Sequence, residues 1–218
     1  STGALPGLRT AAGTPTNTQP FSNLFNAPVP AEMWASINYL PCIGTIRVGN
    51  QKPVIGLEHM ISSRFLDFME RSIGFDIYSN RNNGFEPGFL VGNNSEDERF
   101  TWGLSATRTS NGPFGFNQGG GVWDYTGRLT WLPYYEDNGR HMIHLGLGGK
   151  YQILDRSTGV GIANFNGRWP LRNSQAGLQD VVTFANLEGR DQQIIQPELF
   201  INLGPWSFQA EYIASRVA

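Results

Sequence analysis

Histidines and adjacent carboxylates are the residues that could carry out acid–base or metal chemistry, and their spacing argues against both. His141 and His144 are three positions apart in a run of alternating residues, so they point to opposite faces of a strand and cannot share a metal ion. Asp97 and Glu98 are neighbours and point apart for the same reason. The sequence has no Gly-x-Ser-x-Gly elbow and no phosphate loop that ends in Gly-Lys-Ser or Gly-Lys-Thr. We therefore expect neither an enzyme nor a bound cofactor or metal.

Positive side chains indicate another kind of chemistry. Arg47, Arg128 and Lys150 occupy the polar phase of runs in which apolar and polar residues alternate, so we expect them on a wet face. An anion that loses water must be compensated by positive charge or by hydrogen-bond donors, so such cations could line an anion pathway. Each could also be a solvated charge or the partner of a carboxylate, because exposed ion pairs are common and weak. As a set, they predict an anion-binding surface.

Short alternating runs are the elements that must position these cations. The clearest runs are 100–108, 125–132, 141–151, 197–203 and 206–212. In the first of them, Phe100, Trp102 and Leu104 share one face, and the residues between them are polar or small. This period of two predicts strands with one dry face and one wet face. The turn clusters Gly204-Pro205 and Glu136–Gly139 join neighbouring runs and indicate antiparallel hairpins.

Strands of a barrel and strands of a β-sandwich both show alternating polar and apolar residues, so alternation alone does not distinguish the two folds. Charge content and the positions of aromatic residues do bear on this choice. Charged residues make up 16% of the 218 residues, against about 25% in soluble domains, yet the mean hydropathy is −0.30. Polar lumen-facing residues that dilute apolar lipid-facing ones explain both values. Aromatic residues such as Phe100, Trp131 and Trp206 lie near the ends of the apolar faces, as in an interfacial girdle. We predict an all-β protein, an antiparallel transmembrane β-barrel; a soluble carbohydrate-binding β-sandwich is the weaker alternative.

Other classes of protein fit the sequence poorly. No segment approaches the ~18 consecutive apolar residues that a membrane-spanning helix needs. The net charge of −2 argues against a protein that binds nucleic acid. Cys42 is the single cysteine, so we expect it to act as a small apolar residue and not as a disulfide partner or zinc ligand.

Two segments depart from the strand pattern. Residues 1–30 are rich in Pro, Gly and Thr and predict an N-terminal arm or linker, which leaves residues 31–218 for the barrel. Residues 57–71 contain no Gly or Pro and predict a short helix or helical loop, with Ser62 or Ser63 as its N-cap. Polar or Gly-rich loops are expected at 80–84, 93–98 and 110–121. Long loops at one end and short turns at the other are typical of outer-membrane barrels.

A series of motifs in this sequence resembles the phosphate-selective porin O/P family. The motifs are Gly44–Gly49, Lys52-Pro53, Gly56–Glu58, Ser62–Phe65, Phe68–Ser72, Tyr125–Tyr135, His144–Gly148 and Phe208–Tyr212. The resemblance extends from about residue 37 to the end of the sequence. The order of these motifs along the chain is a more specific signal than any one of them.

The resemblance implies a homotrimeric porin of the bacterial outer membrane, surrounded by outer-membrane lipid, with about 16 strands and a helical constriction loop. It implies passive diffusion of small anions such as phosphate. The Ser-Ser pair of the constriction corresponds to Ser62 and Ser63, and Arg64 follows it. His59 stands before the pair, where the family has a basic residue, and a histidine is uncharged much of the time near pH 7. This departure weakens the expectation of strict phosphate selectivity.

The predicted anion-binding residues are therefore His59, Ser62, Ser63, Arg64, Arg47, Arg128 and Lys150. A barrel of about 16 strands, each of ~9–11 residues, needs more than 218 residues once its connections are included, so we expect a partial chain. One further alternative stays open. The protein could be a structural or scaffold barrel of the outer membrane that binds a partner through its loops or its N-terminal arm.

Overall fold

The structure is a computed structural model. It describes residues 32–66, 68, 71–75, 84–110, 118–156, 159–163, 165, 167–168, 180–182 and 187–218. The predicted arm at residues 1–30 lies outside the described residues, as does most of the loop expected at 80–84.

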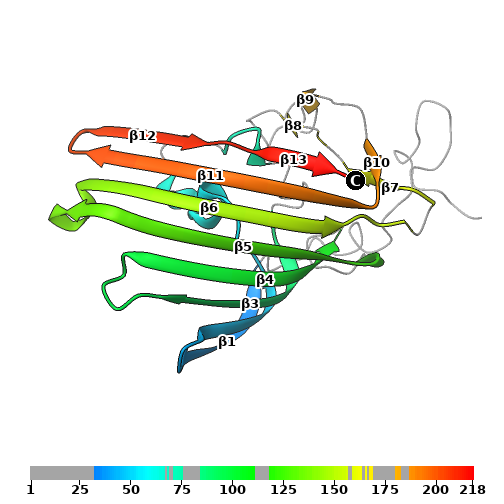
Figure 1. Cartoon of the computed structure of the whole chain (residues 1–218), viewed down its shortest axis with the longest axis horizontal. Helices are drawn as coiled ribbons and strands as arrows, with labels where there is room; N and C mark the ends of the chain where they lie inside the picture. The colour runs from blue at the N-terminus through cyan, green and yellow to red at the C-terminus, as the bar shows by residue number, and fades with distance from the viewer. Residues whose placement is uncertain are drawn as a thin grey trace, which may run out of the picture. The chain divides into compact units, whose positions relative to one another are not determined.

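One antiparallel sheet dominates the described part of the chain (Figure 1). Its strands are β1 (Met33–Leu40), β2 (Gly44–Gln51), β3 (Glu86–Asn94), β4 (Phe100–Ser110), β5 (Gln118–Glu136), β6 (His141–Ile153), β11 (Asp191–Leu203), β12 (Trp206–Glu211) and β13 (Ala214–Val217). The strands pair in the order β1-β2-β3-β4-β5-β6-β11-β12, and β13 also pairs with β11. The protein is thus an all-β protein built on an antiparallel sheet, and among the described strands this sheet is open, with β1 and β12 at the ends of the order.

Shorter elements lie in the connections. Two small antiparallel pairs are formed by β7 (Gly161–Ala163) with β10 (Leu187–Gly189), and by β8 (Gly167–Arg168) with β9 (Asp180–Val182). The helical pieces are α1 (Leu57–Met60), the 3-10 turn η1 (Ser63–Phe65) and the 3-10 turn η2 (Asp137–Gly139). None of the helices in the described part of the chain has the length and apolar character that a membrane span requires.

The two faces of the main sheet differ as the alternation predicts. On the face that we call the inner face, the buried side chains are mostly polar: Gln51, Glu86, Ser105, Thr107, Asp124, Thr126, Lys150, Gln152, Gln192, Gln196 and Glu198. On the outer face, large apolar side chains stay exposed, and Leu104, Leu129 and Leu147 each expose about half of their surface. A soluble sandwich would bury such leucines between two sheets, whereas here they stay exposed. The exposed apolar face is suited to lipid.

The connections at the two ends of the sheet differ in length. Turns of two to five residues join β1 to β2, β3 to β4, β5 to β6 and β11 to β12 at one end. Much longer segments connect β2 to β3 and β6 to β11 at the other end. The predicted turns at Glu136–Gly139 and Gly204-Pro205 are confirmed. The loop expected at 93–98 is wrong in extent: Asn93 and Asn94 belong to β3, because both pair with β4 before the chain turns.

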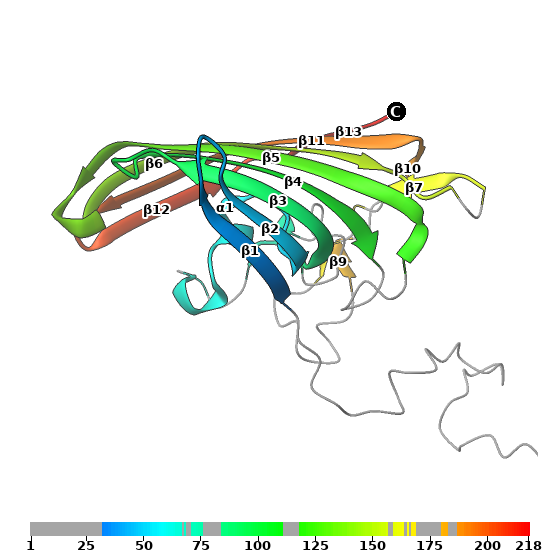
Figure 2. The same cartoon turned by 90° about the horizontal axis from the view of Figure 1, so that it is seen from below.

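The predicted helical segment at 57–71 is shorter and more broken than expected. α1 has only four residues, and Ile61 after it adopts an extended conformation. Ser62 then caps η1, since its Oγ accepts a hydrogen bond of 3.4 Å from the Arg64 amide, which confirms the predicted capping role. Figure 2 shows the main sheet curving, with α1 on its concave side. Contacts of residues 52–62 with the inner face account for this position.

Candidate functional site

The segment 52–62, which we call the inner loop, is attached to the inner face at two places. At one, the Val54 amide donates to Ser105 Oγ at 3.3 Å and to Thr126 Oγ1 at 3.1 Å. These hydroxyls belong to β4 and β5. At the other, the amide of Leu57 donates to Glu211 Oε1 at the end of β12. The inner loop therefore crosses the inner face from β4 and β5 towards the opposite edge of the sheet.

Glycines on the inner face allow this close approach. A Cβ on Gly103 would lie 2.8 Å from Val54 Cγ1, and a Cβ on Gly148 would lie 3.3 Å from Ile55 Cγ1. Ile55 is fully buried and packs with Phe75 in a small apolar cluster. The polar phase of β4 and β6 thus contains glycine because the inner loop fills the space that a side chain would occupy.

Two basic side chains hold the inner loop together. Lys52 Nζ donates to the carbonyl of His59 at 2.8 Å. Arg71 donates from Nε to the carbonyl of Glu58 at 2.8 Å and from Nη2 to the carbonyl of Ile61 at 3.0 Å. Carbonyl oxygens near the end of a short helix lack internal partners, so these bonds close α1 at its C-terminus.

His59 is inside the inner loop, and its side chain is enclosed there. Its ring is fully buried, bonds from Nε2 to the Gly84 carbonyl at 2.9 Å, and meets Phe75 edge-on at 5.3 Å. Because a carbonyl only accepts, Nε2 carries the proton. Burial, with a smaller contribution from the nearby charges of Lys52 and Arg71, lowers the pKa of His59 to about 3, in spite of the Gly84 bond, which acts to raise it. His59 is neutral at pH 7 in this position.

Acid is expected to destabilise the folded state through His59. In the unfolded chain its pKa is about 6.5, whereas in the folded protein it is about 3. Between these values the unfolded chain binds a proton that the folded protein excludes, so the stabilisation is complete above pH 6.5 and is lost as the pH falls towards 3. At pH 5 the loss is about 2 kcal/mol. The urea concentration at the midpoint of unfolding, measured from pH 4.5 to 7, should depend less on pH in His59→Gln than in the wild type. An equal pH dependence in both proteins would contradict the burial of a neutral His59.

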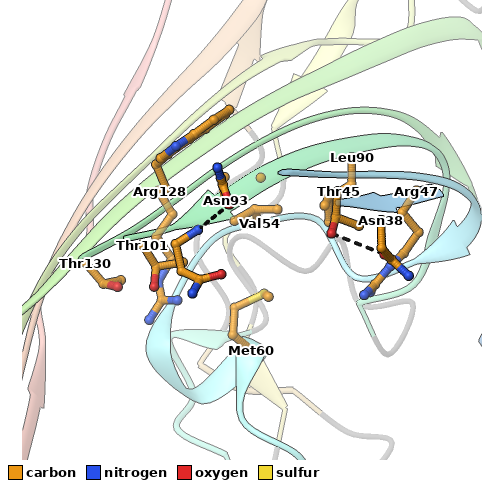
Figure 3. A pocket seen from close by; sticks show the side chains of 14 residues that line it. Asn38, Thr45, Arg47, Val54, Met60, Leu90, Asn93, Thr101, Arg128 and Thr130 are labelled. Carbon is orange, nitrogen blue, oxygen red and sulfur yellow. Dashed lines mark hydrogen bonds between the residues drawn. The ribbon is translucent and has the colours of Figure 1, made fainter. Parts of the chain in front are cut away.

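A pocket of about 280 Å³ lies between the inner loop and the strands β1 to β5 (Figure 3). Its lining combines two arginines with amide and hydroxyl side chains and a few apolar ones. The lining residues are Asn38, Thr45, Arg47, Val54, Met60, Leu90, Gly92, Asn93, Asn94, Thr101, Trp102, Gly103, Arg128 and Thr130. Figure 3 shows Arg47 and Arg128 on opposite sides of this set. The pocket therefore offers both positive charge and hydrogen-bond donors.

Arg47 is the available cation of this pocket. Its guanidinium lies 3.9 Å above the ring of Trp34, the neighbouring inner-face residue on β1. Its Nε is buried and has no hydrogen-bond partner, and no carboxylate pairs with Arg47 within the described part of the chain. Stacking on an aromatic ring orients a guanidinium without neutralising it. Arg47 thus presents uncompensated positive charge to the pocket.

Arg128 lines the same pocket but is paired. Its Nε and Nη2 donate to the two carboxylate oxygens of Glu198 at 2.6 and 3.1 Å. The side chain of Glu198 is fully buried, and that of Arg128 is 12% exposed. A bidentate pair of this kind is strong and directional, and its net charge is zero.

The remaining residues that the sequence predicted to bind anions do not line this pocket. Lys150 lies on the inner face but is fully buried, 2.7 Å from the carboxylate of Asp124, so it does not reach the pocket. Arg64 is exposed beside the ring of Phe65. Ser62 is occupied as a cap, and the side chain of Ser63 lies outside the described residues. The structure therefore brings together Arg47 and Arg128 and leaves the others outside the pocket.

Sequence reasoning missed the residues that govern these two arginines. Glu198 lies on the polar phase of the run 197–203, whereas Trp34 belongs to none of the predicted runs, and nothing in the local sequence pairs either residue with an arginine. Gly146 is the signal that could have indicated Glu198. It lies on the polar phase of β6, between β5 and β11, and a glycine there leaves space for a side chain from a neighbouring strand. Among the described residues, no group of His, Cys, Asp and Glu side chains could hold a metal ion.

Comparison with known proteins identifies a family whose members are porins. The profile of the family described as phosphate-selective porin O and P matches residues 32–218, which covers all of the main sheet and the inner loop. No curated protein gives a significant match to the sequence. Porins of this kind are channels of the bacterial outer membrane, a class distinct from enzymes. The chain belongs to the phosphate-selective porin O and P family.

Proposed function

We propose that this protein lets small anions such as phosphate diffuse passively through its lumen, and the uncompensated charge of Arg47 is the observation that supports this most directly. The guanidinium stacks on Trp34 and lines a pocket that Asn and Thr side chains share. An anion entering this pocket would exchange water for a charged donor and for neutral donors around it. No chemical step or cofactor is needed for such passage.

The two faces of the sheet support the same function. The inner face is polar and faces the inner loop, whereas the outer face exposes the large apolar residues that outer-membrane lipid would cover. We further propose that the protein assembles as a homotrimer, as the family resemblance implies. The scaffold alternative differs in that its lumen would be closed to ions.

Planar-bilayer recording tests this function. The purified protein should run as a trimer on unheated gels and should insert to give discrete conductance steps, with a reversal potential in a KCl gradient that indicates anion preference. Folded trimers that give no steps would contradict the proposal and favour the scaffold alternative. Cation preference would contradict the assignment of an anion pathway.

Replacing Arg47 with Gln is expected to reduce the anion-to-cation permeability ratio by about fivefold, because one unit charge near a wet pathway is removed. The reversal potential in a KCl gradient measures this ratio. Arg99→Gln is the matched control, since Arg99 is exposed in the turn between β3 and β4 and does not line the pocket. An equal loss in both variants would mean that general surface charge, and not Arg47, sets the preference.

A further inference from the structure

The Arg128–Glu198 pair lies in the pocket that Arg47 also lines, and the two arginines differ in one respect. Arg47 has no carboxylate partner within the described part of the chain, whereas Glu198 engages Arg128 with both oxygens. The side chain of Glu198 is 0% exposed, so no anion or cation from the lumen reaches it directly. The negative charge of Glu198 nevertheless affects the net charge of the pocket, because it neutralises Arg128, which lines the pocket.

A glycine on β6 leaves space for the carboxylate of Glu198. Glu198 is on β11 and Arg128 is on β5, and β6 lies between these strands. On β6, Gly148 pairs with Arg128 and Gly146 pairs with Glu198. A Cβ on Gly146 would lie 2.2 Å from Glu198 Oε1. The carboxylate therefore lies across β6 only because residue 146 has no side chain.

We propose that Glu198 is a specificity-determining residue that keeps the anion preference of the channel moderate by neutralising Arg128. The inference rests on the proposed function, because it concerns the ion preference of the same lumen. With Glu198 charged, the pocket holds one uncompensated guanidinium, that of Arg47. Without that charge it holds two, so the pathway attracts anions more strongly and repels cations more strongly.

The test compares the wild type with Glu198→Gln in planar bilayers under a KCl gradient. Gln keeps the size of the side chain and one acceptor oxygen but removes the negative charge. We expect the anion-to-cation permeability ratio to rise about fivefold, and the reversal potential to move towards that of chloride. Glu96→Gln is the control for loss of a negative charge, because Glu96 is exposed in the turn between β3 and β4. It should leave the reversal potential unchanged.

A second variant keeps the proposal testable if a lone buried arginine prevents folding. Arg128→Gln combined with Glu198→Gln removes both charges and leaves Arg47 as the uncompensated cation, so the wild-type reversal potential is expected. A marked change in this double variant, or no change in a folded Glu198→Gln trimer that conducts, would overturn the role of Glu198. Absence of conductance in the wild type would instead refute the proposed function, so the two failures are distinguishable.

Discussion

Replacing Lys150 with Met is expected to reduce the free energy of unfolding by about 3–5 kcal/mol, the cost of removing one partner from a buried ion pair. Lys150 Nζ lies 2.7 Å from Asp124 Oδ2, and both side chains are fully buried. The variant removes the cation and leaves the carboxylate of Asp124 in the same buried position. Urea unfolding of the protein in lipid vesicles, followed by tryptophan fluorescence, measures the loss.

A double-mutant cycle separates the pair from the packing of its members. Lys150→Met combined with Asp124→Asn removes both charges, so the double variant should be more stable than the sum of the single losses predicts. Arg140→Gln is a control, because Arg140 is an exposed residue of the turn between β5 and β6. A loss below about 1 kcal/mol for Lys150→Met would show that water reaches this site and screens the charge.

Replacing Glu211 with Ala is expected to release one end of the inner loop and to increase single-channel conductance. Glu211 Oε1 accepts from the amides of Leu57 and Glu58, the latter at 3.3 Å. Both donor residues are buried, so each amide that loses its acceptor costs about 1–3 kcal/mol in the attached state of the loop. We expect a loop that leaves the inner face to widen the proposed passage. Larger steps with more open-state noise in bilayer recordings would indicate this release.

Glu211→Gln distinguishes the hydrogen bonds from the charge. Its side-chain oxygen can still accept from both amides, so conductance close to that of the wild type is expected. Larger steps in both variants would show that the negative charge of Glu211, and not its acceptor oxygen, holds the loop. Steps of wild-type size in Glu211→Ala would show that the bonds of Val54 to β4 and β5 suffice.

The alternation of residue types determined which face of each strand a side chain occupies. Leu104 and Ser105 are adjacent in sequence, and the first is 53% exposed on the outer face while the second is buried on the inner face. The inward phase of Arg128 and Lys150 followed from the same rule. This information is local, because successive side chains of a strand point to opposite faces whatever the neighbouring strand is. The turns between strands were predictable for a similar reason, since Gly, Pro and Asn act over a few residues.

The partners of the charged side chains were decided by tertiary structure alone. Glu198 is 70 positions from Arg128, and it reaches that arginine because β11 follows β6 in the sheet and Gly146 leaves room between them. The burial of His59 likewise depends on Gly84, which is 25 positions away. Strand order and register are set by the packing of the whole sheet, and local periodicity contains neither. The sequence thus determined that cations line the inner face, and the tertiary structure decided that Arg47 is the available one and that Arg128 and Lys150 are neutralised by partners.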